Sequence, residues 1–279
     1  MRTATAVVFP GQGSQTPDMR DLVAEVRPDL LEHVAAVVGD DPFPRADEGT
    51  NFAQPAIFCA SLAGWEALGR PDAQLMAGHS LGELAALVAA GAVDERAGVE
   101  LVALRGRLMH DAGRQAGDGG MIAVLGRGAS DHAPAIAEAA DLVVANDNSP
   151  QQVVISGARS RLGAALTHAK ELGLRATELD VTGAFHSPMM ASAVPEFERA
   201  LQETTFTEPR VTVVSAVTAQ PFTDPPRELA DALTMPVRWR ETMLTLRALG
   251  AERFIDVGPG RVLTGLAKRT LADVELVNA

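Results

Sequence analysis

The sequence predicts an α/β protein in which a large domain with a parallel sheet carries a small inserted α+β domain. Short apolar runs end in glycine-rich turns that lead into helical segments, which is the usual order in a parallel α/β sheet. The middle of the chain instead shows the order strand, helix, strand, strand, helix, strand, which is typical of a ferredoxin-like unit. A chain of 279 residues, 47% of them hydrophobic, is long enough to bury the core of such a protein.

The predicted large domain opens with a strand at residues 5–9, which a Pro-Gly pair ends, and has a second strand at 74–78. The pattern then becomes helical from Leu81 to Gly91, and Asp94 is a suitable N-cap for a helix that reaches about residue 112. After the small domain we expect a helix ending near residue 203 and a strand at 211–216. Helices at 228–233 and 242–249, a strand at 253–257 and a last helix after a GPG turn complete the large domain.

The predicted small domain has a compact set of elements. In order, its strand, helix, two strands, helix and strand are at residues 121–125, 134–140, 142–146, 152–156, 160–172 and 175–181. The polar segment NDNSPQ is expected to be the turn between the two middle strands. We therefore assign residues 120–186 to the small domain and residues 1–119 and 187–279 to the large domain.

Composition narrows the possible functions. Lys and Arg number 24 against 36 Asp and Glu, which gives a net charge of −12. A chain this acidic lacks the basic surface that nucleic acid or an anionic membrane attracts, so we expect neither as a partner. Cys59 is the only cysteine, which excludes an intramolecular disulfide framework and a cysteine-rich zinc site.

Neither a leader nor a membrane anchor is expected. The start, MRTATAVVFPGQ, has too short an apolar run for a signal peptide. The longest uninterrupted stretch of apolar residues and glycine, 85–93, is about half the length that spans a bilayer. We therefore expect a soluble, cytoplasmic and monomeric protein.

Two glycine-rich turns are candidates for catalysis. Residues 78–82, GHSLG, have the form G-x-S-x-G between a predicted strand and a predicted helix, which is the context of a nucleophile elbow. The alternative is a plain turn whose serine caps the helix. The other turn, FPGQGSQ at 9–15, offers backbone N–H groups that would complete an oxyanion hole with that of Leu81. Its spacing fits neither a dinucleotide fingerprint nor a Walker loop, so a simple tight turn is the alternative.

A serine nucleophile needs a base, and the sequence has six histidines. His186 differs from the others because it lies at the apex of a small-residue loop, TGAFHSP, after a predicted strand. A buried structural histidine is an equal alternative at this position. His79 adjoins the serine, so we expect its side chain to point elsewhere. We expect solvated surface positions for the other four, His33, His110, His132 and His168.

Arg105 interrupts an apolar helical stripe. On a helical wheel it falls within the arc formed by Leu101, Leu104 and Leu108. A buried guanidinium must find an anion, because burying an unpaired charge is costly. The anion is either an internal carboxylate or the carboxylate of a substrate, unless the side chain extends to the edge of the stripe.

Seven segments of the sequence, taken together and in order, indicate a family. They are FPGQGSQ, GHSLGE, LRGRLM, NDNSPQQVVISG, GAFHSPMM, MPVRW and DVGPGRVLTGL. With these segments the sequence resembles the malonyl-CoA:acyl carrier protein transacylases and the acyltransferase domains of polyketide synthases, from Phe9 to about Lys268, nearly the whole chain. The resemblance implies an α/β-hydrolase-like large domain with a ferredoxin-like small one.

The resemblance also implies roles for individual residues. Ser80 matches the nucleophile that carries the acyl group, and His186 matches its general base. Arg105 matches the arginine that pairs with the malonyl carboxylate. The backbone N–H groups of Gln12 and Leu81 match the oxyanion hole.

Some positions depart from the family pattern. The histidine is oriented there by a backbone carbonyl, which falls near Ala232 where the family commonly has glutamine. Leu84 follows the GHSLGE segment, as it does in polyketide synthase acyltransferases, and MPVRW stands where the family has NPVQW. These two departures leave open which biosynthetic pathway the enzyme serves. Phe185 is similar to the malonyl-selective form, and its ring would fill the space that an α-methyl group needs, which gives preference over methylmalonyl rather than exclusion.

The implied reaction is ping-pong transfer of malonyl from malonyl-CoA to the phosphopantetheine thiol of an acyl carrier protein, through a malonyl-serine. It needs no cofactor beyond the CoA thioester substrate and no metal. Two alternatives are a serine hydrolase or thioesterase, and a catalytically silent scaffold. The acyl group could also be methylmalonyl or another, and the pathway fatty-acid, polyketide or malonate decarboxylase.

An acidic carrier would be repelled by the whole chain at −12, so docking would require a local basic patch. The candidates in the sequence are Arg159 with Arg161 and Arg238 with Arg240. Scattered solvated charges are an equal alternative.

Overall fold

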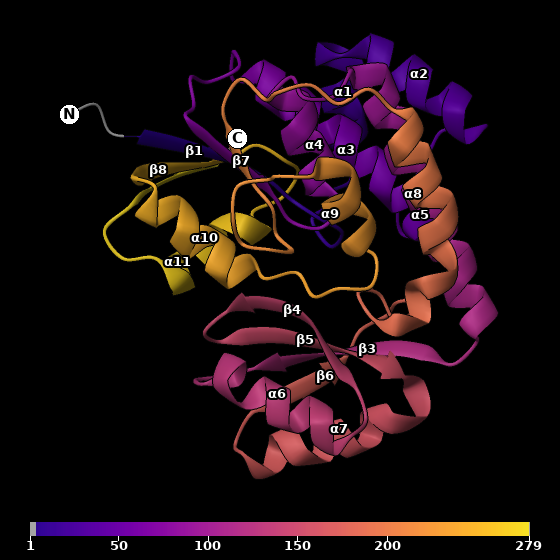
Figure 1. Cartoon of the computed structure of the whole chain (residues 1–279), viewed down its shortest axis with the longest axis vertical. Helices are drawn as coiled ribbons and strands as arrows, with labels where there is room; N and C mark the ends of the chain where they lie inside the picture. Colours follow the sequence, from indigo (N-terminus) through magenta and orange to yellow (C-terminus); the bar gives the residue numbers. More distant parts are fainter. Residues whose placement is uncertain (1–3, 279) are drawn as a thin grey trace.

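The computed structural model describes residues 4–278 of the chain and places them in two sheets (Figure 1). The larger sheet has the order β7-β2-β1-β8-β9, and all of its strand pairs are parallel. Parallel strands need covered faces on both sides, and the central strands of this sheet are buried in both directions. In order of sequence these strands are β1 (Ala4–Phe9), β2 (Leu75–Gly78), β7 (Thr212–Val214), β8 (Ala251–Asp256) and β9 (Glu275–Asn278).

Helices cover both faces of this sheet, and β1 shows how the two cores are divided. Val7 and Phe9 belong to one apolar core, whereas Ala6 and Val8, which point the opposite way, belong to another. The first core includes residues of α1 (Met19–Val26), α2 (Pro28–Val38), α3 (Thr50–Ala67), α4 (Gly82–Ala89), α5 (Glu95–Ala116), α8 (Val194–Glu203) and α9 (Pro225–Asp231). The second includes residues of α10 (Trp239–Ala248) and α11 (Val262–Thr270).

The smaller sheet is antiparallel and has the order β4-β5-β3-β6. With its two helices this order is the ferredoxin-like arrangement that the middle of the sequence predicts. Ile122 and Ile155 point into a core beneath the helices, whereas Met121 and Val154 point the other way, toward the large sheet's domain. The elements are β3 (Gly119–Leu125), α6 (Ala129–Ala139), β4 (Val143–Ser149), β5 (Gln152–Ala158), α7 (Arg159–Glu171) and β6 (Arg175–Glu178).

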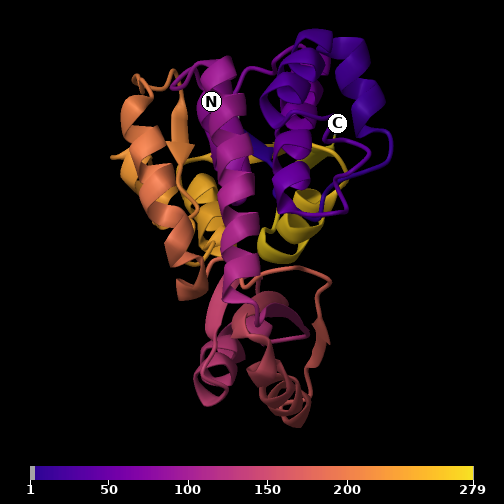
Figure 2. The ribbon, with the colours of Figure 1, turned by 90° about the vertical axis from the view of Figure 1, so that its right-hand side faces the viewer.

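The two parts of the molecule are joined by more than the chain itself. Helix α5 runs from the large sheet's domain down to the small one, where β3 begins three residues after the helix ends (Figure 2). The segment that precedes α10 pairs with β4, since Asp147 N–H donates to Val237 O at 2.9 Å and Val237 N–H donates to Ala145 O at 2.8 Å. These bonds continue the small sheet into the large domain and fix the walls of the space between them.

The observed α/β fold agrees with the predicted fold class. One prediction was wrong: NDNSPQ is not a turn, because β4 continues to Ser149 and only the last two residues of the segment separate it from β5. Asn146 and Asn148 line a cavity, and Asp147 between them pairs with Arg240, which explains how a hydrophilic segment can be a strand. No element was predicted between residues 16 and 73, where α1, α2 and α3 lie, or for β9. Residues 1–3 and 279 of the predicted large domain lie outside the described residues.

Candidate active site

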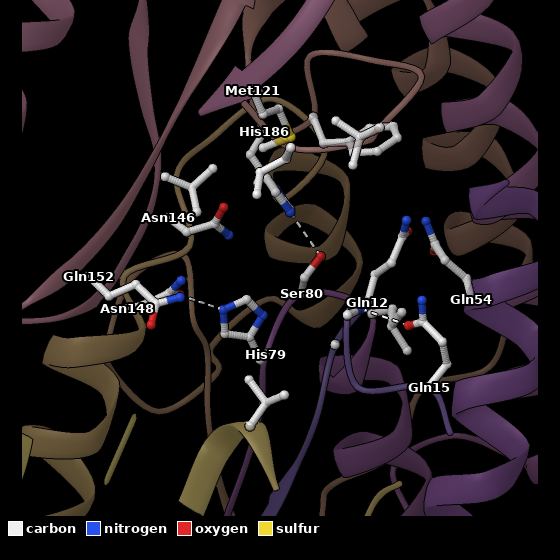
Figure 3. A pocket seen from close by; sticks show the side chains of 18 of the residues that line it. Gln12, Gln15, Gln54, His79, Ser80, Met121, Asn146, Asn148, Gln152 and His186 are labelled. Atoms are coloured by element: carbon white, nitrogen blue, oxygen red, sulfur yellow. Dashed lines mark hydrogen bonds between the residues drawn. The ribbon is translucent and has the colours of Figure 1, made fainter. Parts of the chain in front are cut away.

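Ser80 lies in the tight turn between β2 and α4. Its φ of +54° is a left-handed conformation that L-residues rarely adopt, as a nucleophile elbow requires. The turn is also tightly packed, because a Cβ placed on Gly82 would lie only 2.2 Å from the carbonyl oxygen of Phe9. A glycine at this position therefore lets the turn approach the end of β1, and the serine hydroxyl is left pointing into the space between the two sheets (Figure 3).

His186 faces this hydroxyl from the loop that precedes a 3₁₀ helix, Pro188–Ala193. Its Nε2 lies 2.9 Å from Ser80 Oγ (Figure 3). Its Nδ1 lies 2.8 Å from the carbonyl oxygen of Ala232. A carbonyl only accepts, so Nδ1 carries the proton and the lone pair of Nε2 is directed at the serine. Burial and the nearby charge of Arg105 lower the pKa of His186 to about 3, so the ring is neutral at pH 7 and able to accept a proton.

Arg105 reaches the same serine from α5. Only 2% of its surface is exposed, and its Nη2 donates to Ser80 Oγ at 3.2 Å while Nη1 donates to Gln54 Oε1 at 2.7 Å. Burial lowers the pKa of Arg105 to about 10, which leaves it charged at neutral pH. Within residues 4–278 it forms no ion pair with a carboxylate, so the alternative of an internal salt bridge is wrong. A buried cation therefore stands beside the serine without an anion.

The backbone N–H groups of Gln12 and Leu81, the predicted oxyanion hole, lie beside the space into which the Ser80 hydroxyl points. Leu81 immediately precedes α4, where the N-terminal N–H groups of a helix are unpaired. Gln12 is in the loop after β1, which lies against the nucleophile turn because His79 N–H donates to Phe9 O at 2.9 Å. In the described part of the chain, neither the Gln12 nor the Leu81 N–H donates a hydrogen bond to protein. Both are free to bind an anionic oxygen.

A cavity of about 470 Å³ is lined by Ser80, His186, Gln12 and Leu81, together with residues of both domains. The large domain contributes Gln12, Gln54 and Ser80, and the small-domain strands contribute polar side chains, among them Asn146 and Asn148. Figure 3 shows the two asparagines on the opposite side of Ser80 from Gln12, Gln15 and Gln54. The lining also includes Phe185, the residue expected to limit the acyl group. The cavity is large enough for an acyl group with part of a pantetheine chain.

His79 does not point away from the site as expected. Its ring lines the cavity, and its Nε2 lies 2.8 Å from Asn148 Oδ1 on β4. The edge of the ring also contacts Trp239, with centroids 5.5 Å apart. Burial lowers the pKa of His79. The ring therefore joins the two cavity walls, because β4 reaches across the space to the nucleophile turn.

The predicted basic patch is not a free cationic surface. Arg159 and Arg161 lie at the start of α7, and Arg238 and Arg240 lie at the start of α10. Three of the four are neutralised by ion pairs, Arg159 with Glu178, Arg238 with Glu241 and Arg240 with Asp147. This prediction was wrong for those three: Glu178 and Asp147 are distant in sequence and meet their arginines in the fold, and Glu241 is one helical turn from Arg238.

Several site residues were not identified from the sequence. Gln54 lies inside the apolar run of α3, where a lone polar residue on a buried helix was the available signal. For Asn148 the sequence predicts a turn, and for Asn146 the end of a strand, so neither is predicted to line a cavity. Glu83, three residues after the nucleophile, is buried, and its Oε1 accepts from Ala216 N–H at 2.7 Å. Burial raises the pKa of Glu83 to about 8.

The described residues were also compared with the requirements of a metal site and of a membrane-spanning helix. Within residues 4–278, no group of three or more His, Cys, Asp or Glu side chains is placed to hold a metal ion. Over the same range, every helix is too short or too polar to span a lipid bilayer.

Known proteins resemble the chain over nearly its full length. It is 38% identical to the malonyl CoA-acyl carrier protein transacylase of Synechocystis, over 98% of this chain and 96% of that protein. It is 35% identical to a polyketide biosynthesis malonyl CoA-acyl carrier protein transacylase of Bacillus subtilis, over 96% and 97% of the two chains.

A solved structure shows the same arrangement. It is a malonyl-transacylase in complex with a type II polyketide synthase acyl-carrier protein, and it superposes with a TM-score of 0.90 at 33% identity, over 99% of this chain and 96% of that one. The sequence also matches the acyl transferase domain family over residues 6–278. A histidine and an unpaired arginine thus meet at the hydroxyl of one serine, and the chain belongs to the acyl transferase domain family and, within it, to the malonyl-CoA:acyl carrier protein transacylases.

Proposed function

We propose that this protein transfers a malonyl group from malonyl-CoA to the phosphopantetheine thiol of an acyl carrier protein, for fatty-acid or polyketide synthesis. One observation carries the proposal: Ser80 Oγ lies 2.9 Å from His186 Nε2 and 3.2 Å from the guanidinium of Arg105. A nucleophile, its base and a cation for a free carboxylate thus meet at one oxygen. Malonyl thioesters have a reactive carbonyl and a carboxylate close together, which is the pattern that these groups would recognise.

The first half of the reaction forms an acyl-enzyme. Ser80 Oγ attacks the thioester carbonyl while its proton passes to Nε2 of His186, and the backbone N–H groups of Gln12 and Leu81 bind the oxyanion. The carbon–sulfur bond then breaks, and His186 returns the proton to the departing sulfur. The products are CoA with a free thiol and a malonyl ester on Ser80.

The second half reverses these events with a different thiol. His186 takes the proton from the carrier's phosphopantetheine thiol, and the sulfur attacks the malonyl ester. The carbon–oxygen bond breaks, and the proton returns from His186 to Ser80 Oγ. The reaction balances with its two substrates alone, so we infer that it needs no cofactor or metal. We also infer a cytoplasmic location, because both substrates belong to biosynthesis.

The acyl group would be selected by two residues. Arg105 would form a bidentate pair with the malonyl carboxylate, in a site dry enough to make that pair strong. Phe185 would occupy the space beside the acyl α-carbon and disfavour methylmalonyl. Residues 120–186, the proposed small domain, would form the opposite wall of the cavity, and Asn146 and Asn148 lie on this wall.

A serine hydrolase is the main competing function. His186 Nδ1–H donates its hydrogen bond to the Ala232 carbonyl rather than to an aspartate or glutamate, unlike the triads typical of α/β-hydrolases. Arg105 would also have no partner during hydrolysis of a neutral ester. These two features favour transfer of a dicarboxylic acyl group.

Intact-protein mass spectrometry tests the proposal directly. After mixing with malonyl-CoA, the wild-type protein should gain about 86 Da, the mass of malonyl replacing hydrogen, and lose it when phosphopantetheinylated carrier is added. The Ser80→Ala variant should gain nothing. Loss of the adduct to water at the same rate without carrier would mean that the protein is a hydrolase. Absence of any adduct on the wild-type protein would contradict the proposal.

A further inference from the structure

A chain of side-chain hydrogen bonds connects Arg105 to the loop that carries Gln12. Arg105 Nη1 donates to Gln54 Oε1 at 2.7 Å, and Gln54 Nε2 donates to Thr50 Oγ1 at 2.8 Å. Thr50 Oγ1 donates in turn to Gln12 Oε1, also at 2.8 Å. The proposed carboxylate-binding cation and the proposed oxyanion loop are therefore linked through two side chains of α3.

The direction of every bond in this chain is fixed by its first member. A guanidinium can only donate, so the oxygen of Gln54 must face Arg105 and its NH₂ group must face Thr50. Because the Thr50 hydroxyl oxygen accepts from Gln54, its single proton is left for Gln12. The amide of Gln12 then has its oxygen bound to Thr50 and its two N–H donors free for other partners. A threonine hydroxyl is suited to the middle position because it accepts and donates at once.

The backbone supports this chain at a tight helix crossing. A Cβ on Gly106, next to Arg105 on α5, would lie 2.8 Å from Thr50 O and 3.4 Å from Gln54 Cβ. The glycine therefore allows the first turn of α3 to approach α5 closely. Thr50 and Gln54 are both buried, with 1% and 2% of their surfaces exposed, so water cannot replace a missing partner.

We propose that Thr50 is a positioning residue that acts through Gln54 on Arg105, and that it thereby contributes to selection of a dicarboxylic acyl group. This inference rests on the proposed function of the site. With malonyl bound, Gln54 would hold one edge of the guanidinium and leave the other edge for the carboxylate. Loss of the Thr50 hydroxyl would free the Gln54 amide to rotate, and Arg105 would lose its fixed orientation.

Thr50→Val tests this because it keeps the shape of the side chain and removes the hydroxyl. Acyl-enzyme formation from malonyl-CoA and from acetyl-CoA should be measured separately, by quenching the reaction at set times and detecting the Ser80 adduct by mass spectrometry. We expect kcat/KM for malonyl-CoA to fall about tenfold, as for loss of a buried hydrogen-bond partner, and that for acetyl-CoA to change less than about threefold. Thr50→Ser, which retains a hydroxyl, should restore the malonyl rate and the ratio.

A matched control distinguishes positioning from a general loss of stability. Thr242 is also fully buried on a helix, and its hydroxyl donates to Arg238 O at 3.0 Å. Thr242→Val should lower the thermal midpoint without changing the malonyl-to-acetyl ratio. Should Thr50→Val not fold, Thr50→Ala and Thr50→Ser provide the same comparison.

Three outcomes would overturn the inference: equal losses for both acyl groups in Thr50→Val, an unchanged malonyl rate, or failure of Thr50→Ser to restore the ratio. Each of these requires a wild-type protein that does form malonyl-Ser80. Absence of that adduct would instead contradict the proposed function itself, so the two failures are distinguishable.

Discussion

His186 receives its orientation from the backbone of Ala232, whose carbonyl oxygen lies 2.8 Å from the ring's Nδ1. A carbonyl fixes the tautomer as an aspartate would, but it brings no negative charge that would stabilise an imidazolium. Burial and the positive charge of Arg105 therefore act without opposition from a carboxylate, and the pKa of His186 falls to about 3. The geometry depends on the path of the chain rather than on the side chain at position 232.

This relationship predicts the pH dependence of acyl-enzyme formation. The neutral ring is the active form of a base, and it predominates at every pH above its folded-state pKa. We expect kcat/KM for malonyl-CoA to be nearly constant from about pH 5 to 8, with no inflection at the ordinary histidine value of 6.5. Rapid-quench measurements across this range, in buffers of constant ionic strength, would check it. A tenfold decline per pH unit below 6.5 would contradict the depressed pKa.

The same shift predicts a loss of stability in acid. Between pH 6.5 and 3 the unfolded chain binds a proton at position 186 that the folded chain does not. His186 therefore lowers the free energy of unfolding as the pH falls below 6.5, and makes no such contribution above it. The loss should be smaller in His186→Gln, when urea unfolding of the two proteins is compared at pH 7 and pH 5. Identical losses would show that other groups cause the effect.

Arg105→Ala should reverse the preference between acyl groups. Removing the guanidinium leaves the malonyl carboxylate buried without a partner, so kcat/KM for malonyl-CoA should fall on the order of 10²-fold or more. Acetyl-CoA, which has no carboxylate, should react as fast as before or faster. Arg107→Ala is the control, because Arg107 is on the same helix but exposed and paired with Glu196. Equal losses for both substrates would indicate that Arg105 is structural.

Phe185→Ala should widen the acyl pocket. Phe185 lines the cavity, and its removal creates room for an α-methyl group. A methyl group in a pocket is worth about 1–3 kcal/mol, so the methylmalonyl-to-malonyl ratio of kcat/KM should rise about tenfold. Competition between the two CoA esters, with adducts resolved by mass, measures this ratio. An unchanged ratio in a folded variant would show that the ring does not contact the acyl group.

We expect docking of the carrier protein to depend on α11 more than on the pairs Arg159 with Arg161 and Arg238 with Arg240. Val262 and Leu266 of this helix line the cavity, and Val262 is 41% exposed at its edge. Lys268 and Arg269 are exposed on its last turn and form no ion pair within the described residues. Arg269 is seven residues from Val262 and so lies on the same side of the helix.

Arg269→Glu should therefore raise KM for an acidic carrier several-fold and leave kcat for malonyl-Ser80 formation almost unchanged. Arg96→Glu is the matched control, since Arg96 is exposed and unpaired in the described chain. It lies in the first turn of α5, and Figure 2 shows that this helix reaches the small domain only at its other end. Arg159→Glu with Arg161→Glu should have the smaller effect. Equal KM values for all of these variants would exclude electrostatic docking on α11.

The sequence by itself determined the main outline of this protein. Local rules predicted the strand–turn–helix around Ser80 and the N-cap at Asp94, whose side chain accepts from the N–H groups of Arg96 and Ala97. They also predicted the ferredoxin-like order of the small domain. The buried position of Arg105 followed from helical periodicity. These features depend on residues close together in the chain, which is why their pattern can be read directly.

Other features were decided only by the tertiary structure. Helix α3 is buried over most of its length and includes Pro55, so it lacks the polar and apolar period that identifies a helix at the surface. Asn146 and Asn148 belong to a segment, NDNSPQ, whose composition is typical of a turn. They nevertheless extend a strand, because the cavity on one side of that strand provides polar surroundings for their side chains. The contacts that define the site join residues such as Thr50 to Gln12 and Asn148 to His79, at separations of 38 and 69 positions. No local pattern records such pairs, because each partner is chosen by how the helices and sheets pack.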